Sequence, residues 1–262
     1  MLGAIAGDII GSIYEDGLYL KSSNFQLFQK ECRFTDDTVM TVAVADSLMQ
    51  GAEKDDSLYV KNLQAYGRKY PNAGYGGMFH QWIFDDEPKP YNSFGNGSAM
   101  RVSPVSFYFN DLNTVLQEAE KSAAVTHNHP EGIKGAQAVA AAVFLARTGH
   151  SKDQVKAYVE ETFGYNLDRK LEDLRPAYRF DVTCQGSVPE SIRCFLESED
   201  VESAIRNAVF LGGDTDTMAC IAGGIAEAHY GGVPGWMAVE VKKRLDDDLI
   251  QKVEAFHRIA QP

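Results

Sequence analysis

Two short acidic segments of this chain follow almost the same pattern of residue types. Residues 34–38 read Phe-Thr-Asp-Asp-Thr, and residues 213–217, far along the chain, read Gly-Asp-Thr-Asp-Thr. Each segment leads into an apolar stretch with helical periodicity, so each is expected at the start of a helix. If folding brings the segments together, four carboxylates share a small volume, and they cannot all stay ionised without a compensating charge.

Divalent cations are the natural compensation, because hard cations such as Mg²⁺ prefer oxygen ligands. No Lys or Arg lies within either segment, and only Arg33 adjoins the first. The alternative is that the acidic residues merely cap helices, since a helix N-terminus favours negative charge by about 0.3–1 kcal/mol. Two Asp residues with flanking Thr exceed what a cap requires, and unpaired carboxylates before buried helices are costly. We therefore interpret the chain as a metal-dependent enzyme.

The elements that must position these residues are predicted to be helices. Apolar residues at helical spacing are clearest over residues 36–49, 130–148 and 216–230, with Thr35 as an N-cap and Pro130 at a first helical position. Further helices are expected near residues 2–15, 111–125, 152–163, 188–197, 200–210 and 234–257, the last interrupted around residues 246–248. Since no convincing alternating strand is present, we predict one all-α domain over residues 1–262, with its longest irregular stretch at residues 71–110.

The first predicted helix has two unusual features. Gly3, Gly7 and Gly11 recur at four-residue spacing. They cost about 1 kcal/mol each relative to Ala, so we expect them where another helix approaches closely. Asp8 and Glu15 lie seven residues apart and therefore on one helical face. This face is either a third acidic part of the site or a solvated amphipathic surface.

Composition limits the classes of partner. The 262 residues carry a formal net charge of −12 and are 44% hydrophobic, which suits a sizeable core and disfavours general binding to nucleic acids or anionic membranes. The four cysteines form no Cys-x-x-Cys pair, so reduced thiols are expected. Neither a signal peptide nor a stretch of transmembrane length is evident. A cytoplasmic location is therefore expected, and a monomer is favoured because no large repeated apolar surface pattern stands out.

Five segments, in this order, resemble the motifs of the ADP-ribosylglycohydrolase family. They are Gly7-Asp8-Ile9-Ile10-Gly11 leading to Glu15, Phe34-Thr35-Asp36-Asp37-Thr38, Gly95-Asn96-Gly97-Ser98-Ala99-Met100-Arg101, Thr126-His127 and Gly212-Gly213-Asp214-Thr215-Asp216-Thr217. Each segment alone is weak, but five in order over residues 3 to about 232 are specific. The resemblance implies a single compact, orthogonal helical bundle of this family's type, two bound Mg²⁺ (or Mn²⁺) ions, and hydrolytic release of ADP-ribose from a modified acceptor.

The resemblance also implies roles for individual residues. The expected metal ligands are Thr35, Asp36 and Asp37 from one side and Asp214, Asp216 and Thr217 from the other. Glu15 and Asp37 are the candidate catalytic carboxylates, and a metal-bound water is a further candidate for activation. The expected substrate-binding residues are Phe94, Asn96, Gly97, Ser98, Met100 and His127.

The residues themselves give partial support to the substrate assignment. Glycines at 95 and 97 permit close backbone approach to phosphate oxygens, although an ordinary Gly/Asn turn explains them too. The partner is expected to be ADP-ribose, an ADP-ribosylated protein or a small conjugate, and the acceptor linkage stays open. Two alternative functions are a non-catalytic ADP-ribose-binding or crystallin-like protein, which the complete acidic set disfavours, and a metal-dependent phosphohydrolase of nucleotide derivatives.

Overall fold

The computed structural model describes residues 1–15, 20 and 22–260, and every regular element in this part of the chain is a helix. The longer helices are α1 (Leu2–Gly11), α2 (Asp36–Met49), α3 (Ser57–Lys69), α7 (Leu112–Ala124), α8 (Pro130–Arg147), α9 (Lys152–Phe163), α11 (Cys184–Leu196), α12 (Val201–Leu211), α13 (Thr215–Tyr230) and α15 (Asp247–Ile259). The shorter helices are α4 (Gly77–Ile83), α5 (Gly97–Met100), α6 (Ser103–Tyr108), α10 (Leu171–Leu174) and α14 (Gly235–Lys242). The predicted all-α class is confirmed.

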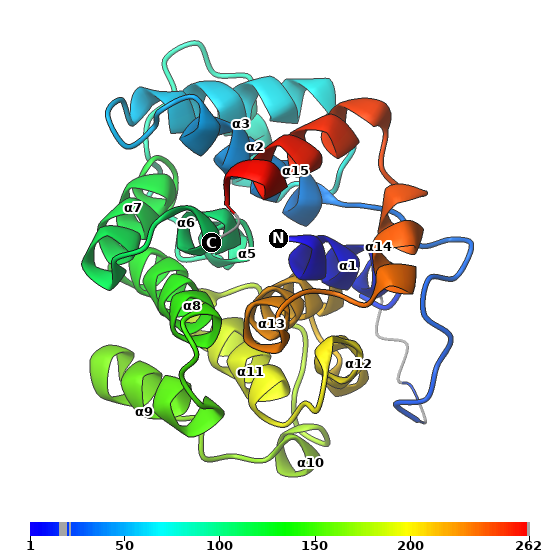
Figure 1. Cartoon of the computed structure of the whole chain (residues 1–262). Coiled ribbons are helices and arrows are strands. Elements are labelled where there is room, and N and C mark those ends of the chain that lie inside the picture. The colour runs from blue at the N-terminus through cyan, green and yellow to red at the C-terminus, as the bar shows by residue number, and fades with distance from the viewer. Residues whose placement is uncertain (16–19, 21, 261–262) are drawn as a thin grey trace.

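Two helices from opposite ends of the sequence form the centre of the bundle. Figure 1 shows α1 beside α13, with α2, α3 and α15 on one side and α8, α11 and α12 on the other. The glycines of α1 permit this contact, because a Cβ atom added at Gly7 would lie 2.0 Å from the carbonyl oxygen of Ala219. Cβ atoms added at Gly3 and Gly11 would lie 2.3 and 2.4 Å from backbone oxygens of α13. The predicted close helix approach is confirmed.

Most helix boundaries agree with the sequence pattern. Helices α2 and α9 have the predicted bounds, Thr35 caps α2 by accepting from the Asp37 N–H, and Pro130 opens α8. Two boundaries differ by four residues from the prediction. Helix α11 begins at Cys184 and not near residue 188, and α1 ends at Gly11, so Glu15 follows the helix and does not continue its face. Of the two alternatives for the face that carries Asp8, the solvated surface is wrong for this residue, because Asp8 is fully buried.

The sequence pattern missed five helices, namely α3, α4, α5, α6 and α10. Helix α3 was not predicted, because two of its four buried positions are Asn62 and Gly67 and the apolar stripe is therefore interrupted. Residues 71–110, expected to be irregular, contain α4, α5 and α6. Helix α4 begins at the second residue of the Gly76-Gly77 pair and is held by packing, since Phe79 and Trp82 are buried and stacked with ring centroids 5.5 Å apart.

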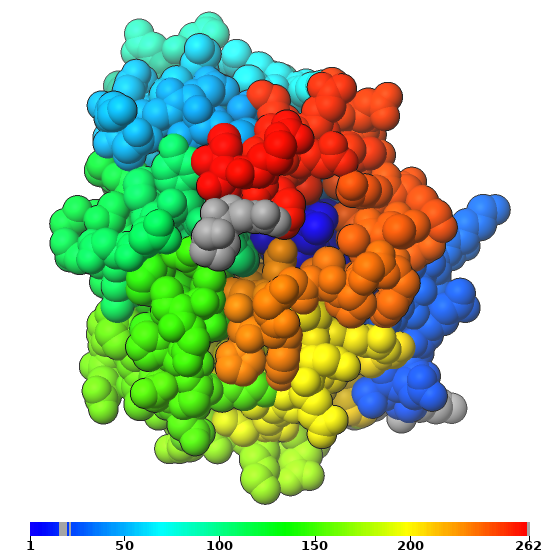
Figure 2. Space-filling model, in the orientation of Figure 1, coloured from blue at the N-terminus to red at the C-terminus, as the bar shows by residue number. Residues whose placement is uncertain are grey.

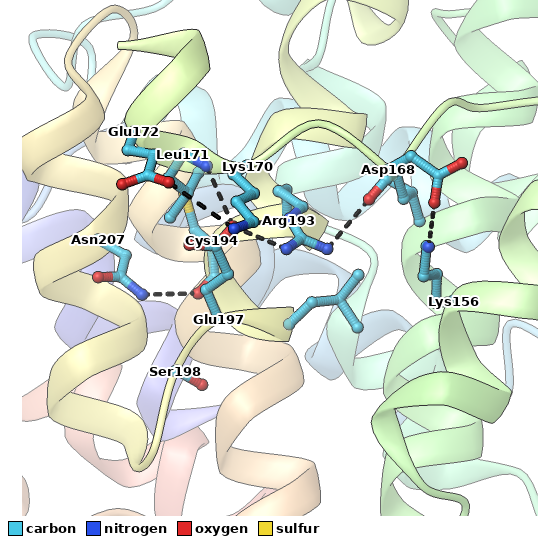
Figure 3. Close-up of polar contacts among 12 residues, drawn as sticks. Lys156, Asp168, Lys170, Leu171, Glu172, Arg193, Cys194, Glu197, Ser198 and Asn207 are labelled. Carbon is cyan, nitrogen blue, oxygen red and sulfur yellow. Dashed lines mark hydrogen bonds and ion pairs between the residues drawn. The ribbon is translucent and has the colours of Figure 1, made fainter.

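A polar network fixes the segment between α9 and α10 onto α11 (Figure 3). Arg193 of α11 donates to the carbonyl of Leu167 at 3.0 Å and to the carboxylate of Glu197 at 2.7 Å. Glu197 also accepts from the Leu171 N–H, and Asn207 of α12 donates to the Cys194 carbonyl at 3.0 Å. These contacts tie the C-terminal half of α11 to its neighbours. Thr183, the residue before α11, lines the cavity described below.

Figure 2 shows the N-terminal residues in a hollow between α13 and α15. This cavity of about 440 Å³ is lined by Leu2, Glu227, Val253 and Phe256 among others. The α-amino group of Met1 donates to the Glu227 carboxylate at 2.5 Å. Among the described residues, no helix combines the length and the apolar character that crossing a bilayer requires.

Candidate active site

The fold brings the two acidic segments together. Thr217 at the start of α13 donates its hydroxyl to Asp37 of α2 at 3.2 Å, and the hydroxyl oxygen of Thr35 lies 3.3 Å from a carboxylate oxygen of Asp216. The approach of α1 to α13 adds Asp8, so that carboxylate oxygens of Asp8, Asp37 and Asp216 lie within 4.8 Å of one another. The carboxylate oxygens of Glu15, Asp214 and Asp216 form a second group, which also lie within 4.8 Å of one another.

Burial and mutual repulsion raise the pKa values of this acidic cluster, which comprises Glu15, Asp36, Asp37, Asp214, Asp216 and Asp8. Burial raises the pKa of Asp37 well above its ordinary value, and the charge of Asp216 raises it further. Burial likewise raises the pKa of Asp214 and of Asp216. For Asp36, burial and the charge of Asp8 raise the pKa to about 7. Without a compensating cation, the cluster therefore holds protons at neutral pH.

The oxygen atoms of the cluster fit divalent cations. Buried Asp37 has a carboxylate oxygen, Oδ1, with no hydrogen-bond partner in the described part of the chain. No Lys or Arg among the described residues forms an ion pair with any of the six carboxylates. A buried, unpaired carboxylate oxygen is costly unless it coordinates or pairs, and an all-oxygen ligand set suits Mg²⁺, Mn²⁺ or Ca²⁺.

Asp8 has a different environment from the other carboxylates. Its two oxygens accept from the N–H groups of Thr35 and Thr38 at 3.0 Å and from both threonine hydroxyls. All four donors belong to the first turn of α2 or its N-cap. Asp8 thus fastens α1 to the start of α2 and orients Thr35 beside Asp216. The sequence contained a signal for this role, since Asp8 is the only charged residue of an otherwise apolar α1.

The acidic cluster opens into a cavity of about 570 Å³, a usual size for a small-molecule site. Glu15, Asp36, Asp37, Asp214, Asp216 and Thr217 lie on its wall. Of the residues expected to bind substrate, the cavity includes Phe94, Asn96, Gly97, Met100 and His127. Ser98 and Thr35 do not line it: the Ser98 hydroxyl is fully buried and donates to the Gly132 carbonyl at 2.8 Å.

Residues 94–97 form one wall of the cavity, called here the glycine-rich wall, and backbone hydrogen bonds hold it in place. The Asn96 N–H donates to the Val182 carbonyl at 2.8 Å, and the Cys184 N–H donates to the Phe94 carbonyl at 2.9 Å. The Asn96 side chain donates to Asp214 at 2.7 Å and to Ser187 of α11 at 3.1 Å. Asn96 therefore orients a carboxylate of the acidic cluster and connects it to the glycine-rich segment.

Several cavity residues were not assigned a role from the sequence. Phe180, Val182 and Thr183 reach the cavity from the segment before α11, and Met78 and Phe79 reach it from α4. Phe180 and Met78 are exposed at its mouth, with 57% and 60% of their surface accessible. Single apolar residues carry no local signal of such a role, because only the packing of distant segments places them at one opening.

The comparisons with known proteins agree with this geometry. The model of the ADP-ribosylglycohydrolase family matches residues 1–261, so the chain belongs to that family. It is 28% identical to the ADP-ribosylhydrolase ARH3 of Mus musculus, over 88% of this chain and 82% of that protein. It is 26% identical to the ADP-ribosylarginine hydrolase Tri1 of Pseudomonas putida (strain GB-1), over 100% of this chain and 78% of that protein.

A solved structure supports the fold independently. A chain of an ADP-ribosylglycohydrolase-related protein complex superposes with a TM-score of 0.72 at 24% identity, covering 99% of this chain and 97% of that chain. The family resemblance inferred from the five motifs is thus confirmed, and the chain is a hydrolase of the ADP-ribosylglycohydrolase class.

Proposed function

We propose that the protein hydrolyses the glycosidic bond between ADP-ribose and a modified acceptor in a reaction that depends on divalent cations. The observation that carries the proposal is the partnerless Oδ1 atom of Asp37, buried where two groups of carboxylates meet at a cavity of about 570 Å³. The names of two relatives, an ADP-ribosylhydrolase and an ADP-ribosylarginine hydrolase, support the reaction class. The acceptor is a protein side chain, such as arginine or serine, or a small conjugate.

The metal-binding residues in this proposal are Thr35, Asp36, Asp37, Asp214, Asp216 and Thr217, and two Mg²⁺ or Mn²⁺ ions are expected. When bound, such ions supply positive charge that orients oxygen groups of a substrate and acidifies bound water. Thr35 retains a role here although it does not line the cavity, because its hydroxyl oxygen lies between Asp8 and Asp216. Asn96 holds Asp214 in place through its side-chain N–H.

Glu15 is the carboxylate best placed to accept a proton from the attacking water. It lines the cavity and is only partly buried, whereas Asp37 and Asp216 are 2% and 4% exposed and belong to the innermost part of the cluster. A general base must reach the proton that it accepts, and Glu15 is both accessible and adjacent to the cluster. Asp37 then serves as a ligand, so we assign the proton transfer to Glu15.

The remaining cavity residues bind and orient the nucleotide part of the substrate. Phe94 packs against His129 with ring centroids 5.3 Å apart and is 43% exposed on the wall, so the exposed part of its ring can stack against a planar group. Gly97 permits backbone approach, and Met100 and His127 close the wall beside it. These contacts would fix the sugar relative to Glu15, and such positioning is a major part of catalysis.

The direct test is an assay of free ADP-ribose released from arginine-linked and serine-linked ADP-ribosyl peptides and from O-acetyl-ADP-ribose, with Mg²⁺ or Mn²⁺ present. We expect release from at least one linkage, and loss of release with EDTA. The double variant Asp36→Asn, Asp37→Asn should lose at least about a thousandfold in turnover, since the metal contribution amounts to several kcal/mol. Asp111→Asn, which changes an exposed helix cap away from the cavity, is the matched control.

The same assay separates the competing functions. Binding of ADP-ribose without release from any linkage would indicate a non-catalytic binding protein. Formation of AMP or inorganic phosphate in place of intact ADP-ribose would indicate a phosphohydrolase. Either result would contradict the proposed reaction.

A further inference from the structure

Arg101 is a buried cation without a carboxylate partner. The residue is 1% exposed, and no acidic residue in the described part of the chain forms an ion pair with it. Its Nη2 atom donates to the Ser122 carbonyl at 2.9 Å and to the Thr126 hydroxyl at 2.8 Å, while its buried Nε has no partner. Burying a charge without a carboxylate partner is costly. We therefore ask what the buried guanidinium of Arg101 does through its hydrogen bond to Thr126.

The Thr126 hydroxyl lies between Arg101 and His127. Its oxygen accepts from Arg101 and is 2.7 Å from Nδ1 of His127. A threonine hydroxyl has one hydrogen to donate, and two acceptors are within reach: Nδ1 of His127 and the Ala123 carbonyl. The Ala123 carbonyl is 3.5 Å away and already accepts the N–H groups of Thr126 at 3.1 Å and His127 at 2.7 Å. Both its lone pairs are therefore used, and the hydroxyl hydrogen goes to Nδ1.

This direction determines where His127 carries its own proton. If Nδ1 accepts, a neutral imidazole must have its hydrogen on Nε2. Nε2 has no hydrogen-bond partner among the described residues, and His127 lines the cavity. A Cβ atom added at Gly97 would lie 3.2 Å from Nε2, and one added at Gly95 would lie 3.6 Å from it. The N–H therefore lies over the glycine-rich wall, where a ligand oxygen would accept it.

We propose that Arg101 and Thr126 are positioning residues that hold His127 in its Nε2–H tautomer, so that the imidazole serves as a neutral hydrogen-bond donor to an oxygen of the ligand and not as a base. The identity of that ligand rests on the proposed function. Burial lowers the pKa of His127 well below its usual value, and the charge of Arg101 lowers it further. Both effects keep the ring neutral at physiological pH and support the proposal.

The tautomer is measurable in the ligand-free protein by long-range ¹H–¹⁵N NMR of histidine-labelled samples. We expect Nδ1 of His127 to give an unprotonated signal and Nε2 a protonated one. Thr126→Val removes the hydroxyl and should produce a mixture of tautomers, whereas Thr126→Ser keeps the hydroxyl and should restore the wild-type signals. Thr148→Val is the matched control, because Thr148 lies 3.2 Å from Nδ1 of His150 and neither residue lines the cavity.

Binding and turnover give a second readout. Thr126→Val should weaken ADP-ribose binding about tenfold, the value expected for one misdirected hydrogen bond, while Thr126→Ser and Thr148→Val should stay within about twofold. His127→Gln carries an amide N–H close to the position of Nε2 and should retain more binding and turnover than His127→Ala. A residue acting as a base would show no such rescue by glutamine.

The outcomes are separable from those of the proposed function. A protonated Nδ1 in the wild-type protein, an imidazolium at neutral pH, or an unchanged tautomer in Thr126→Val would overturn the positioning role. If ADP-ribose neither binds nor is released while the Nε2–H tautomer responds to Thr126 as described, the proposed substrate is wrong and the hydrogen-bond chain stands.

Discussion

At the scale of single residues, two buried aspartates show opposite environments within one cluster. Asp8 accepts four hydrogen bonds from the start of α2, whereas Asp37 has an oxygen with no partner in the described part of the chain. A carboxylate whose oxygens are all engaged has a structural role, and a carboxylate with a free buried oxygen is available to coordinate an ion. We therefore expect substitution by Asn to change the free energy of unfolding differently at Asp8 and at Asp37.

Asp8→Asn should lower the free energy of unfolding of the ligand-free protein by about 2–4 kcal/mol. The substitution replaces one carboxylate oxygen, which accepts hydrogen bonds, with an NH₂ group that would face the same N–H and O–H donors. Asp37→Asn should leave it unchanged or raise it by up to about 2 kcal/mol at pH 8, because the repulsion from Asp216 disappears. Urea denaturation of both variants without divalent cations measures the difference. Equal destabilisation by the two substitutions would contradict these assignments.

The sequence predicted the four paired aspartates of the site but did not decide the role of Asp8. Asp36, Asp37, Asp214 and Asp216 were recognisable because two acidic residues with flanking Thr preceded apolar helices. The importance of Asp8 was not decided, because one charged residue in an apolar helix fits either a buried contact or a solvated face. Only the position of α13 against α1 shows which is correct, and that position is not a local property of residues 2–11.

At the scale of elements, the contact between α1 and α13 decides whether the two acidic segments meet. Gly7 is the tightest point, where an added Cβ would lie 2.0 Å from the Ala219 carbonyl oxygen. Gly224, in the middle of α13, differs, since the nearest atom to an added Cβ would be the Ala4 Cβ at 3.4 Å. The two glycines therefore provide a matched pair for testing this contact.

Gly7→Ala should lower the free energy of unfolding by at least about 3 kcal/mol, because the backbone of α13 would have to move. Gly224→Ala should leave stability unchanged or raise it by up to about 1 kcal/mol, because alanine favours the helix and the site has room. Thermal and urea denaturation measure both effects. A mild effect of Gly7→Ala, similar to that of Gly224→Ala, would show that the two helices do not pack as closely as described.

The helices that sequence periodicity predicted are those whose buried face is apolar. Helices α2, α8 and α13 are long and have nearly continuous runs of buried small or apolar residues. Helix α4 has only seven residues and depends on stacking of its aromatic side chains, some of which border the cavity. Short helices of this kind owe their stability to tertiary packing, so local propensity does not indicate them.

At the scale of the whole molecule, the acidic cluster links stability, pH and cation binding. A carboxyl group whose pKa is higher in the folded state binds more protons when folded, so its contribution to stability decreases as pH rises from the unfolded pKa to the folded one. For Asp36 this window runs from 3.8 to about 7. The pKa values of Asp37, Asp214 and Asp216 are also raised, by burial first, so these groups add to the decrease in the same direction.

The buried histidine has the opposite effect, but in a different pH range. Burial lowers the pKa of His127, so its contribution to stability rises with pH only up to its ordinary value of 6.5. Measurements between pH 6.5 and pH 8.5 therefore exclude the contribution of His127. In this range the unfolding free energy of the ligand-free protein should decrease as pH rises, because carboxyl groups with raised pKa values in the folded state bind more protons there than in the unfolded chain.

Divalent cations should reverse this dependence, because they bind the deprotonated cluster and their stabilisation grows with pH. With millimolar Mg²⁺ or Mn²⁺, we expect the unfolding free energy to stay level or rise between pH 6.5 and pH 8.5. The double variant Asp36→Asn, Asp37→Asn should show a smaller pH slope without cations and little response to them.

Asp111→Asn should shift the whole curve without changing its slope, since the pKa of Asp111 is lowered by its hydrogen bonds with Thr114 and this residue titrates at lower pH. A ligand-free protein whose stability is constant or increases over this range would show that the carboxylates are stabilised by something other than a bound cation.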